Sequence, residues 1–203
     1  MAVPAAISLA DGYGMHDDIY TEYMRYLGLA LNLGVRFVEL DVHWIQVARL
    51  FGHPPVEWDA ETVGCNPSLS SLPTKDQRSF SSAVSEVAAW LLASQGSPSP
   101  SPRDDEFLVV YLDDQPDLAQ WGHVGELLEQ VTAAIPRDLI VSPAELRAIT
   151  LEQGAPPSID MLVGRYGKRV LLMSASDYGP AMDHLAHTHH SLCNLSEPLF
   201  RSM

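Results

Sequence analysis

Two carboxylates lie side by side in the stretch 34–44, whose other residues suit a buried strand. Glu39 and Asp41 are two residues apart, and the period of a strand places both side chains on the same face. Like charges at this spacing repel. A strand tolerates them where it ends at a solvent-filled site or where a cation lies between the carboxylates. An edge strand with both carboxylates facing water is the alternative interpretation.

Further polar residues follow the other expected strands. His16 and Asp17 come after the first strand, Asp113 and Asp114 come just past the third, and His53 lies in the loop after the acidic strand. Chemistry gathers at the C-terminal ends of strands in parallel sheets, so we expect these groups to converge. The predicted constellation contains Asp17, Asp18, Glu39, Asp41, Asp113, His16 and His53.

This set of groups favours metal-assisted phosphodiester cleavage. Carboxylate oxygens from several strand ends suit calcium or magnesium better than zinc, which prefers histidine and cysteine. Two histidines beside a divalent cation suit general base and general acid work, because imidazole titrates near neutral pH. A glycosidase with a carboxylate pair is the rival chemistry, but Glu39 and Asp41 lie too near each other on one strand to flank a scissile bond easily.

The elements that must position these residues alternate between strands and helices, which predicts an α/β fold with a parallel sheet, either a barrel or an open sheet. The continuous apolar run 106–112 predicts a strand covered on both faces. Segment 45–78 is rich in glycine and proline and is predicted to be a long irregular connection, which usually carries function or else contains an unrecognised element. The expected strands are 4–9, 34–44, 106–112, 139–141 and 169–173, and the expected helices are 19–33, 79–94, 118–134 and 144–151.

Composition excludes several classes of protein. The chain has 203 residues, 46% of them hydrophobic, and a formal net charge of -14, so nucleic acid and anionic membranes are not expected partners. No apolar run approaches the ~20 residues of a membrane span, and residues 1–10 lack the basic region of a signal peptide. Cys65 and Cys193 belong to no ligand cluster, and a disulfide between them is left open.

The stretch 34–44 resembles the second-strand motif of the X region of phosphatidylinositol-specific phospholipase C and of its small phospholipase C-like phosphodiesterase relatives. That family also has a first-strand histidine followed by Asn or Asp, which His16 and Asp17 match. His53 matches a second histidine after the acidic strand, and Asp113 matches a third-strand acidic residue. With the Gly-Lys strand in 166–173, the resemblance extends over most of residues 5–179.

The resemblance implies a TIM (β/α)₈-type phosphodiesterase barrel, of which this chain has about five of the eight strands. It implies a calcium site, with magnesium as an option, and attack by a neighbouring hydroxyl of a phospholipid or glycerophosphodiester. A catalytically inactive truncated domain that acts as a binding module is the alternative. Extracellular location would fit some relatives. The implied roles are metal ligation by Asp17, Glu39, Asp41 and Asp113, and proton transfer by His16 and His53.

The domain division expected from these patterns is a partial barrel over residues 1–179, with a low-complexity insertion at 95–102, and a histidine-containing tail over 180–203. We expect that tail to be a polar terminus outside the core. Among single residues, we expect Asp114 to be solvated and Trp121 to pack. Ser174–Ser176 stand where phosphoinositide-specific relatives carry lysines, so a polyphosphorylated inositol is not the expected substrate.

Overall fold

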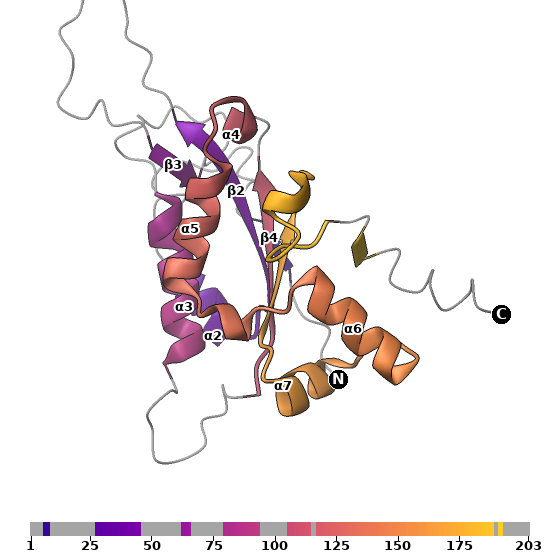
Figure 1. Cartoon of the computed structure of the whole chain (residues 1–203). Helices are drawn as coiled ribbons and strands as arrows, with labels where there is room; N and C mark the ends of the chain where they lie inside the picture. The colour runs from indigo at the N-terminus through magenta and orange to yellow at the C-terminus, as the bar shows by residue number, and fades with distance from the viewer. Residues whose placement is uncertain are drawn as a thin grey trace, which may run out of the picture.

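A mixed sheet of five strands forms the centre of the chain (Figure 1). The computed structural model describes residues 6–8, 27–45, 62–65, 79–93, 105–114, 117–188 and 191–192. The strands run in the order β1-β2-β4-β5 and are parallel, while β3 pairs antiparallel with β2. The strands are β1 (Ala6–Ser8), β2 (Phe37–Ile45), β3 (Thr62–Cys65), β4 (Leu108–Asp114) and β5 (Val170–Ser174). The predicted α/β class is confirmed. Strand β3 lies within segment 45–78, which the sequence predicts to be an irregular connection.

Helices pack on both sides of this sheet, but unequally. In Figure 1, α2, α3 and α5 lie side by side against one face, and α6 and α7 lie on the other side. No helix among the described residues is long and apolar enough to cross a membrane. The helical segments are α2 (Leu27–Asn32), α3 (Phe80–Leu92), α4 (Asp117–Gln120), α5 (Val124–Ala134), η2 (Arg137–Leu139), α6 (Pro143–Gln153), α7 (Ile159–Tyr166) and η3 (Gly179–Ala181).

The main core lies between the sheet and α2, α3 and α5. Along β4, buried side chains alternate with partly exposed ones, and Leu108, Val110 and Leu112 belong to the main core. The intervening Val109 packs instead against a smaller cluster that includes residues of α6 and α7. On its second face, the expected strand 106–112 is covered by described residues near its start, and Tyr111 and Asp113 are partly exposed.

Several helices begin and end where the sequence carries the matching caps. In α3, Ser79 accepts a hydrogen bond from the backbone N–H of Ser82, and in α6, Ser142 and Glu145 form a reciprocal capping box. The sequence interpretation missed α7, although Ser158 caps its start and Gly167 ends it with a φ of 66°.

The predicted helix 118–134 is two helices, because the chain turns at Gly122, which has a φ of 78°. Non-glycine residues rarely adopt that backbone conformation. The amide of His123 then donates to the carbonyl of Leu118. Trp121 lies in this turn and is 49% exposed, so the prediction that it packs is wrong.

The predicted strand 139–141 is a single β-bridge at the outer edge of β5. Ile140 pairs in parallel with Val170, on the side of β5 away from β4. Pro136 and Pro143 flank this segment, and proline has no N–H to extend a ladder. Consecutive strands of a (β/α)₈ barrel are neighbours. Here segment 139–141 follows β4 in the sequence but lies beyond β5 in the sheet, so the spatial order differs from that of a simple barrel. The sheet of the described residues is open.

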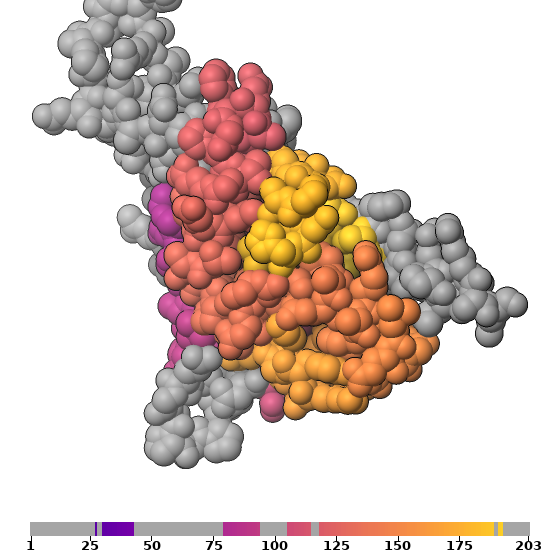
Figure 2. All heavy atoms as spheres, viewed as in Figure 1, coloured from indigo at the N-terminus to yellow at the C-terminus, as the bar shows by residue number. Residues whose placement is uncertain are grey.

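The start of the expected tail belongs to the fold. Met182, Leu185 and Ala186 are buried in the main core, and His187 is fully buried. Figure 2 shows the yellow segment of the chain lying against the salmon and orange segments. The expectation of a polar terminus outside the core is therefore wrong for residues 182–187, because three apolar side chains in this segment fill space beside the sheet.

Candidate functional site

Asp41, in the middle of β2, and Asp113, near the C-terminal end of β4, lie opposite each other on two neighbouring strands. In the parallel pairing of β2 with β4, Asp41 is the partner of Asp113 and Glu39 is the partner of Tyr111. Paired residues point to the same face of a sheet, and so do residues two apart on one strand. All four side chains therefore lie on the face opposite the main core. Asp41 is 9% exposed, and Glu39 and Asp113 are partly exposed.

Tyr111 adds a phenol to this acidic face, and the sequence interpretation did not select it. Its ring stacks on that of Phe37, with 6.1 Å between ring centroids. Burial raises the pKa of Tyr111, and the charges of Asp113 and Glu39 raise it further. The phenol therefore keeps its proton at neutral pH and can donate a hydrogen bond. Tyr111 precedes Asp113 by two residues, as Glu39 precedes Asp41. This spacing could have indicated from the sequence that Tyr111 shares the face of Asp113.

The donors on this face suit a hard cation in type but not in number. Carboxylate oxygens are the ligands that calcium and magnesium prefer, and calcium takes six to eight of them. Within the described part of the chain, no three His, Cys, Asp or Glu side chains lie close enough together to hold a metal ion. A cation at Asp41 and Asp113 would therefore need further ligands.

Asp114 has a structural role. It is only 3% exposed, and its Oδ1 accepts from the Ser174 hydroxyl at 2.8 Å, the Ala175 amide at 3.0 Å and the Ser176 amide at 3.3 Å. The prediction that Asp114 is solvated is wrong, because its side chain points away from that of Asp113 and ties the turn after β5 to the end of β4.

Other predicted site residues cannot be placed. His16, Asp17, Asp18 and His53 lie outside the described residues, and so does Cys193, whose pairing with Cys65 the sequence leaves open. The structure places Glu39, Asp41 and Asp113 on one face of two neighbouring strands, while the convergence of the histidines on them stays a prediction.

Comparison with known proteins gives one distant likeness. No family model matches the chain, and no curated protein matches it. A solved structure, the apo form of a calcium-dependent phosphoinositol-specific phospholipase C from the Gram-negative bacterium Pseudomonas sp, aligns with 15% sequence identity and a TM-score of 0.46. The alignment covers 87% of this chain and 57% of that one. The chain thus has a weak similarity of fold to a bacterial phospholipase C, which says nothing about its activity.

Proposed function

We propose that this chain is a metal-assisted phosphodiesterase of the phospholipase C type. The observation that supports this most directly is the register of β2 and β4, which pairs Asp41 with Asp113. Two carboxylates in direct opposition are unfavourable unless a site uses them. The pair lies near the C-terminal end of the parallel pairing of β2 with β4, which ends one residue later at Val42 and Asp114. Active sites of α/β proteins gather at that end of parallel strands.

In this proposal Asp17, Glu39, Asp41 and Asp113 hold the cation, and His16 and His53 act as base and acid. The three described carboxylates do not lie close enough together to hold a metal ion by themselves, so the proposed site requires Asp17 and a closer approach of these side chains on binding. A bound calcium ion would offset negative charge on the phosphoryl oxygens. One histidine removes the proton of the attacking hydroxyl, and the other protonates the leaving oxygen. The proposed substrate is a phospholipid or a small glycerophosphodiester.

The proposal also includes a barrel-like enclosure of this face. Helices α2, α3 and α5 cover one side of the sheet. The carboxylates lie on the other side, where α6 and α7 pack near the start of β4. Phe37 and Tyr111 would form part of the floor beside the carboxylates.

A turnover assay tests the activity. The wild-type chain is incubated with phosphatidylinositol, and separately with glycerophosphoinositol, in calcium and in chelator. Calcium-dependent release of the phosphorylated headgroup is expected, with a loss of at least 100-fold in Asp41→Asn and His16→Ala, because catalytic groups contribute on the order of 10²-fold or more. Glu129→Gln, at an exposed carboxylate on α5, is the matched control and should keep full activity.

Calcium binding is measured separately, because binding and turnover can fail independently. Terbium replaces calcium, and Tyr111 should sensitise its emission if the ion lies on this face. Tyr111→Phe should reduce that emission, and Glu39→Gln should weaken binding. Binding without turnover of either substrate would favour the binding-module alternative. If neither binding nor turnover is observed in a folded wild-type chain, the proposed site is wrong.

A further inference from the structure

The backbone of His187 completes the outer edge of β5. Its amide donates to the carbonyl of Leu172 at 2.8 Å, and its carbonyl accepts from the amide of Ser174 at 2.8 Å. His187 is thus a one-residue parallel partner of Met173. Together with Ile140, it occupies an edge that would otherwise expose unpaired backbone groups.

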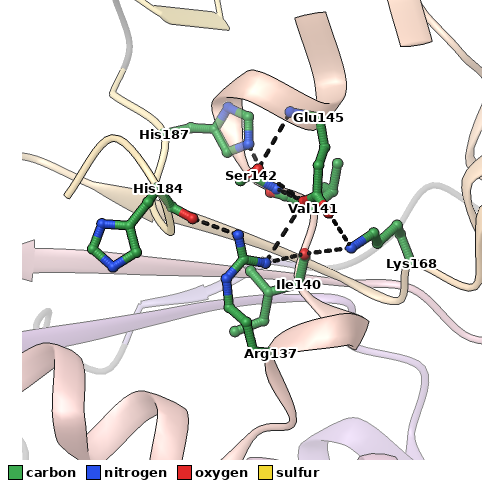
Figure 3. A network of polar contacts seen from close by, with 8 residues as sticks. All are labelled: Arg137, Ile140, Val141, Ser142, Glu145, Lys168, His184 and His187. Atoms are coloured by element: carbon green, nitrogen blue, oxygen red, sulfur yellow. Dashed lines mark hydrogen bonds and ion pairs between the residues drawn. The ribbon is translucent and has the colours of Figure 1, made fainter. Parts of the chain in front are cut away.

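The contacts of the His187 imidazole determine the tautomer of its neutral form. Its Nε2 lies 2.9 Å from the carbonyl oxygen of Val141 (Figure 3). A carbonyl oxygen only accepts, so Nε2 carries the proton, and Nδ1 of the neutral ring carries none. Nδ1 is buried and has no hydrogen-bond partner among the described residues. A second proton would have to be placed at this buried atom.

Charged groups beside this ring offer little compensation for an added positive charge. Figure 3 shows Arg137 from η2, Glu145 from α6 and Lys168 ahead of β5 in the same network. Glu145 is already engaged by Lys168 at 2.7 Å and lies 3.6 Å from Arg137. It also accepts from the amide and the hydroxyl of Ser142, each at 2.8 Å. The network therefore holds two cations and one committed carboxylate.

Among the described residues of the remaining neighbouring elements, no carboxylate is paired with His187. On β4, Asp114 is bonded to the turn after β5, and β5 itself, Val170–Ser174, contains no ionisable side chain. Arg169, which precedes β5, donates to the carbonyl of Glu106. In the segment itself, Asp183 and His184 are exposed, and the carbonyl of His184 accepts from Arg137.

We propose that residues 182–188, here named the latch, close the outer edge of β5 in a pH-dependent way, and that protonation of His187 at Nδ1 releases them. The proton comes from solvent, and the imidazolium is hydrated once the latch leaves the edge. Release uncovers the carbonyl of Leu172 and the amide of Ser174. An edge with unpaired backbone groups can then accept another strand. This inference is independent of the proposed phosphodiesterase activity.

The direction of the pH response follows from burial. Burial lowers the pKa of His187 from its ordinary value of 6.5, and the Val141 carbonyl raises it by a smaller amount. Because the closed form binds the proton less readily than the open form, the latch is fully stable above pH 6.5 and loses stability below it. One proton taken up on opening makes the opening constant rise about tenfold for each pH unit in that window.

Amide hydrogen exchange measures latch opening in the intact chain. The amides of His187 and Ser174 report the latch, and the amide of Val109, bonded to the carbonyl of Arg36 between β2 and β4, reports the sheet. After correction for intrinsic exchange, latch protection should fall about tenfold per pH unit below 6.5 while that of Val109 stays constant. Constant latch protection, or an equal fall at Val109, overturns the proposal.

Variants separate His187 from other acid-sensitive groups. His187→Gln keeps an amide donor for the Val141 carbonyl but cannot take up a proton, so its latch protection should not change with pH. His184→Gln, at an exposed side chain in the same segment, should keep the wild-type response. An unchanged response in His187→Gln overturns the proposal. If that variant does not fold, NMR titration of the wild-type imidazole decides, and an unshifted or raised pKa at His187 overturns it.

Discussion

Asp41 on β2 and Asp113 on β4 are direct partners in the register of two neighbouring parallel strands. Their charges have the same sign, and Glu39 stands two residues earlier on the same face. The main core lies on the opposite side of the sheet. Electrostatic repulsion is therefore concentrated on this face of the sheet, beside the C-terminal end of β4, where a cation would relieve it.

Neutralising one member of this pair should stabilise the chain when no divalent cation is present. In chelator, Asp113→Asn is expected to raise the free energy of unfolding by about 0.5 kcal/mol, the scale of one like-charge cross-strand pair. Calcium should stabilise the wild type more than the variant. Urea unfolding with and without calcium measures both effects, with Asp138→Asn, at an exposed position on η2, as control. A loss of stability in chelator would contradict the repulsion.

Arg36 joins several groups at the opposite end of the strands. Its guanidinium forms two hydrogen bonds with the carboxylate of Glu106 and donates to the carbonyls of Leu31 and Val35 at 2.8 and 2.7 Å. It also lies 4.8 Å from the ring centroid of Trp90. A lysine cannot reproduce this planar set of donors.

We therefore expect Arg36→Lys to lower the free energy of unfolding by about 2 kcal/mol, because it leaves partly buried acceptors without donors. Chemical denaturation measures the loss. Arg165→Lys is the matched control, since its ion pair with Glu152 is more than half exposed on both sides and should change stability by about 0.5 kcal/mol or less. Equal losses in the two variants would show that the hydrogen bonds of the Arg36 guanidinium add no more stability than the exposed Arg165–Glu152 ion pair.

Asp114 should matter more for stability than its hydroxyl partner. Asp114→Ala removes the carboxylate that accepts from the Ser174 hydroxyl and from the amides of Ala175 and Ser176. The two amides keep the Leu112 carbonyl at 2.8 Å and the Ser174 hydroxyl at 3.2 Å as second acceptors, so we expect a loss of about 2 kcal/mol. Ser174→Ala removes one donor and should cost about 1 kcal/mol. Asp114→Asn keeps an acceptor oxygen and should lose less than the alanine variant. Thermal and urea unfolding of the three variants test this order. A smaller loss of stability in Asp114→Ala than in Ser174→Ala would contradict it.

Glu145 makes the free energy of unfolding depend on pH in the acid range. Burial raises the pKa of its carboxyl, but hydrogen bonds from Lys168 and Ser142 outweigh burial and lower the pKa from 4.5 to about 2. The folded state then binds this proton less readily than the unfolded state. Its stabilisation is present above pH 4.5 and is lost as the pH falls toward about 2. The side chain is 40% exposed, so solvent screening keeps the effect near 1 kcal/mol or below.

Urea unfolding across that pH window checks this term. Glu145→Gln should show a smaller loss of stability than the wild type as the pH falls from 4.5 to about 2. Glu152→Gln, which alters an exposed pair on the same helix, should follow the wild type. If the free energy of unfolding of Glu145→Gln falls with pH as steeply as that of the wild type, other carboxylates cause the acid response.

Local patterns in the sequence determined much of the fold. The strand period put Glu39 and Asp41 on one face, and the apolar spacing predicted α3 and most of α5 and α6. These features depend on residues a few positions apart, whose relative directions follow from backbone geometry alone. The same reasoning failed at Gly122, where one glycine divides an otherwise helical segment, and at α7, whose caps were present but not recognised.

Tertiary structure decided which groups face each other. The pairing of Asp41 with Asp113, the burial of Asp114 beneath the turn after β5, and the position of His187 against Val141 all depend on contacts between distant segments. Strand order and register are set by how the whole chain fills its core, so nearby residues do not specify them. The sequence thus determined which side chains could form an acidic site, and only the packed sheet decided that two of them stand opposite each other.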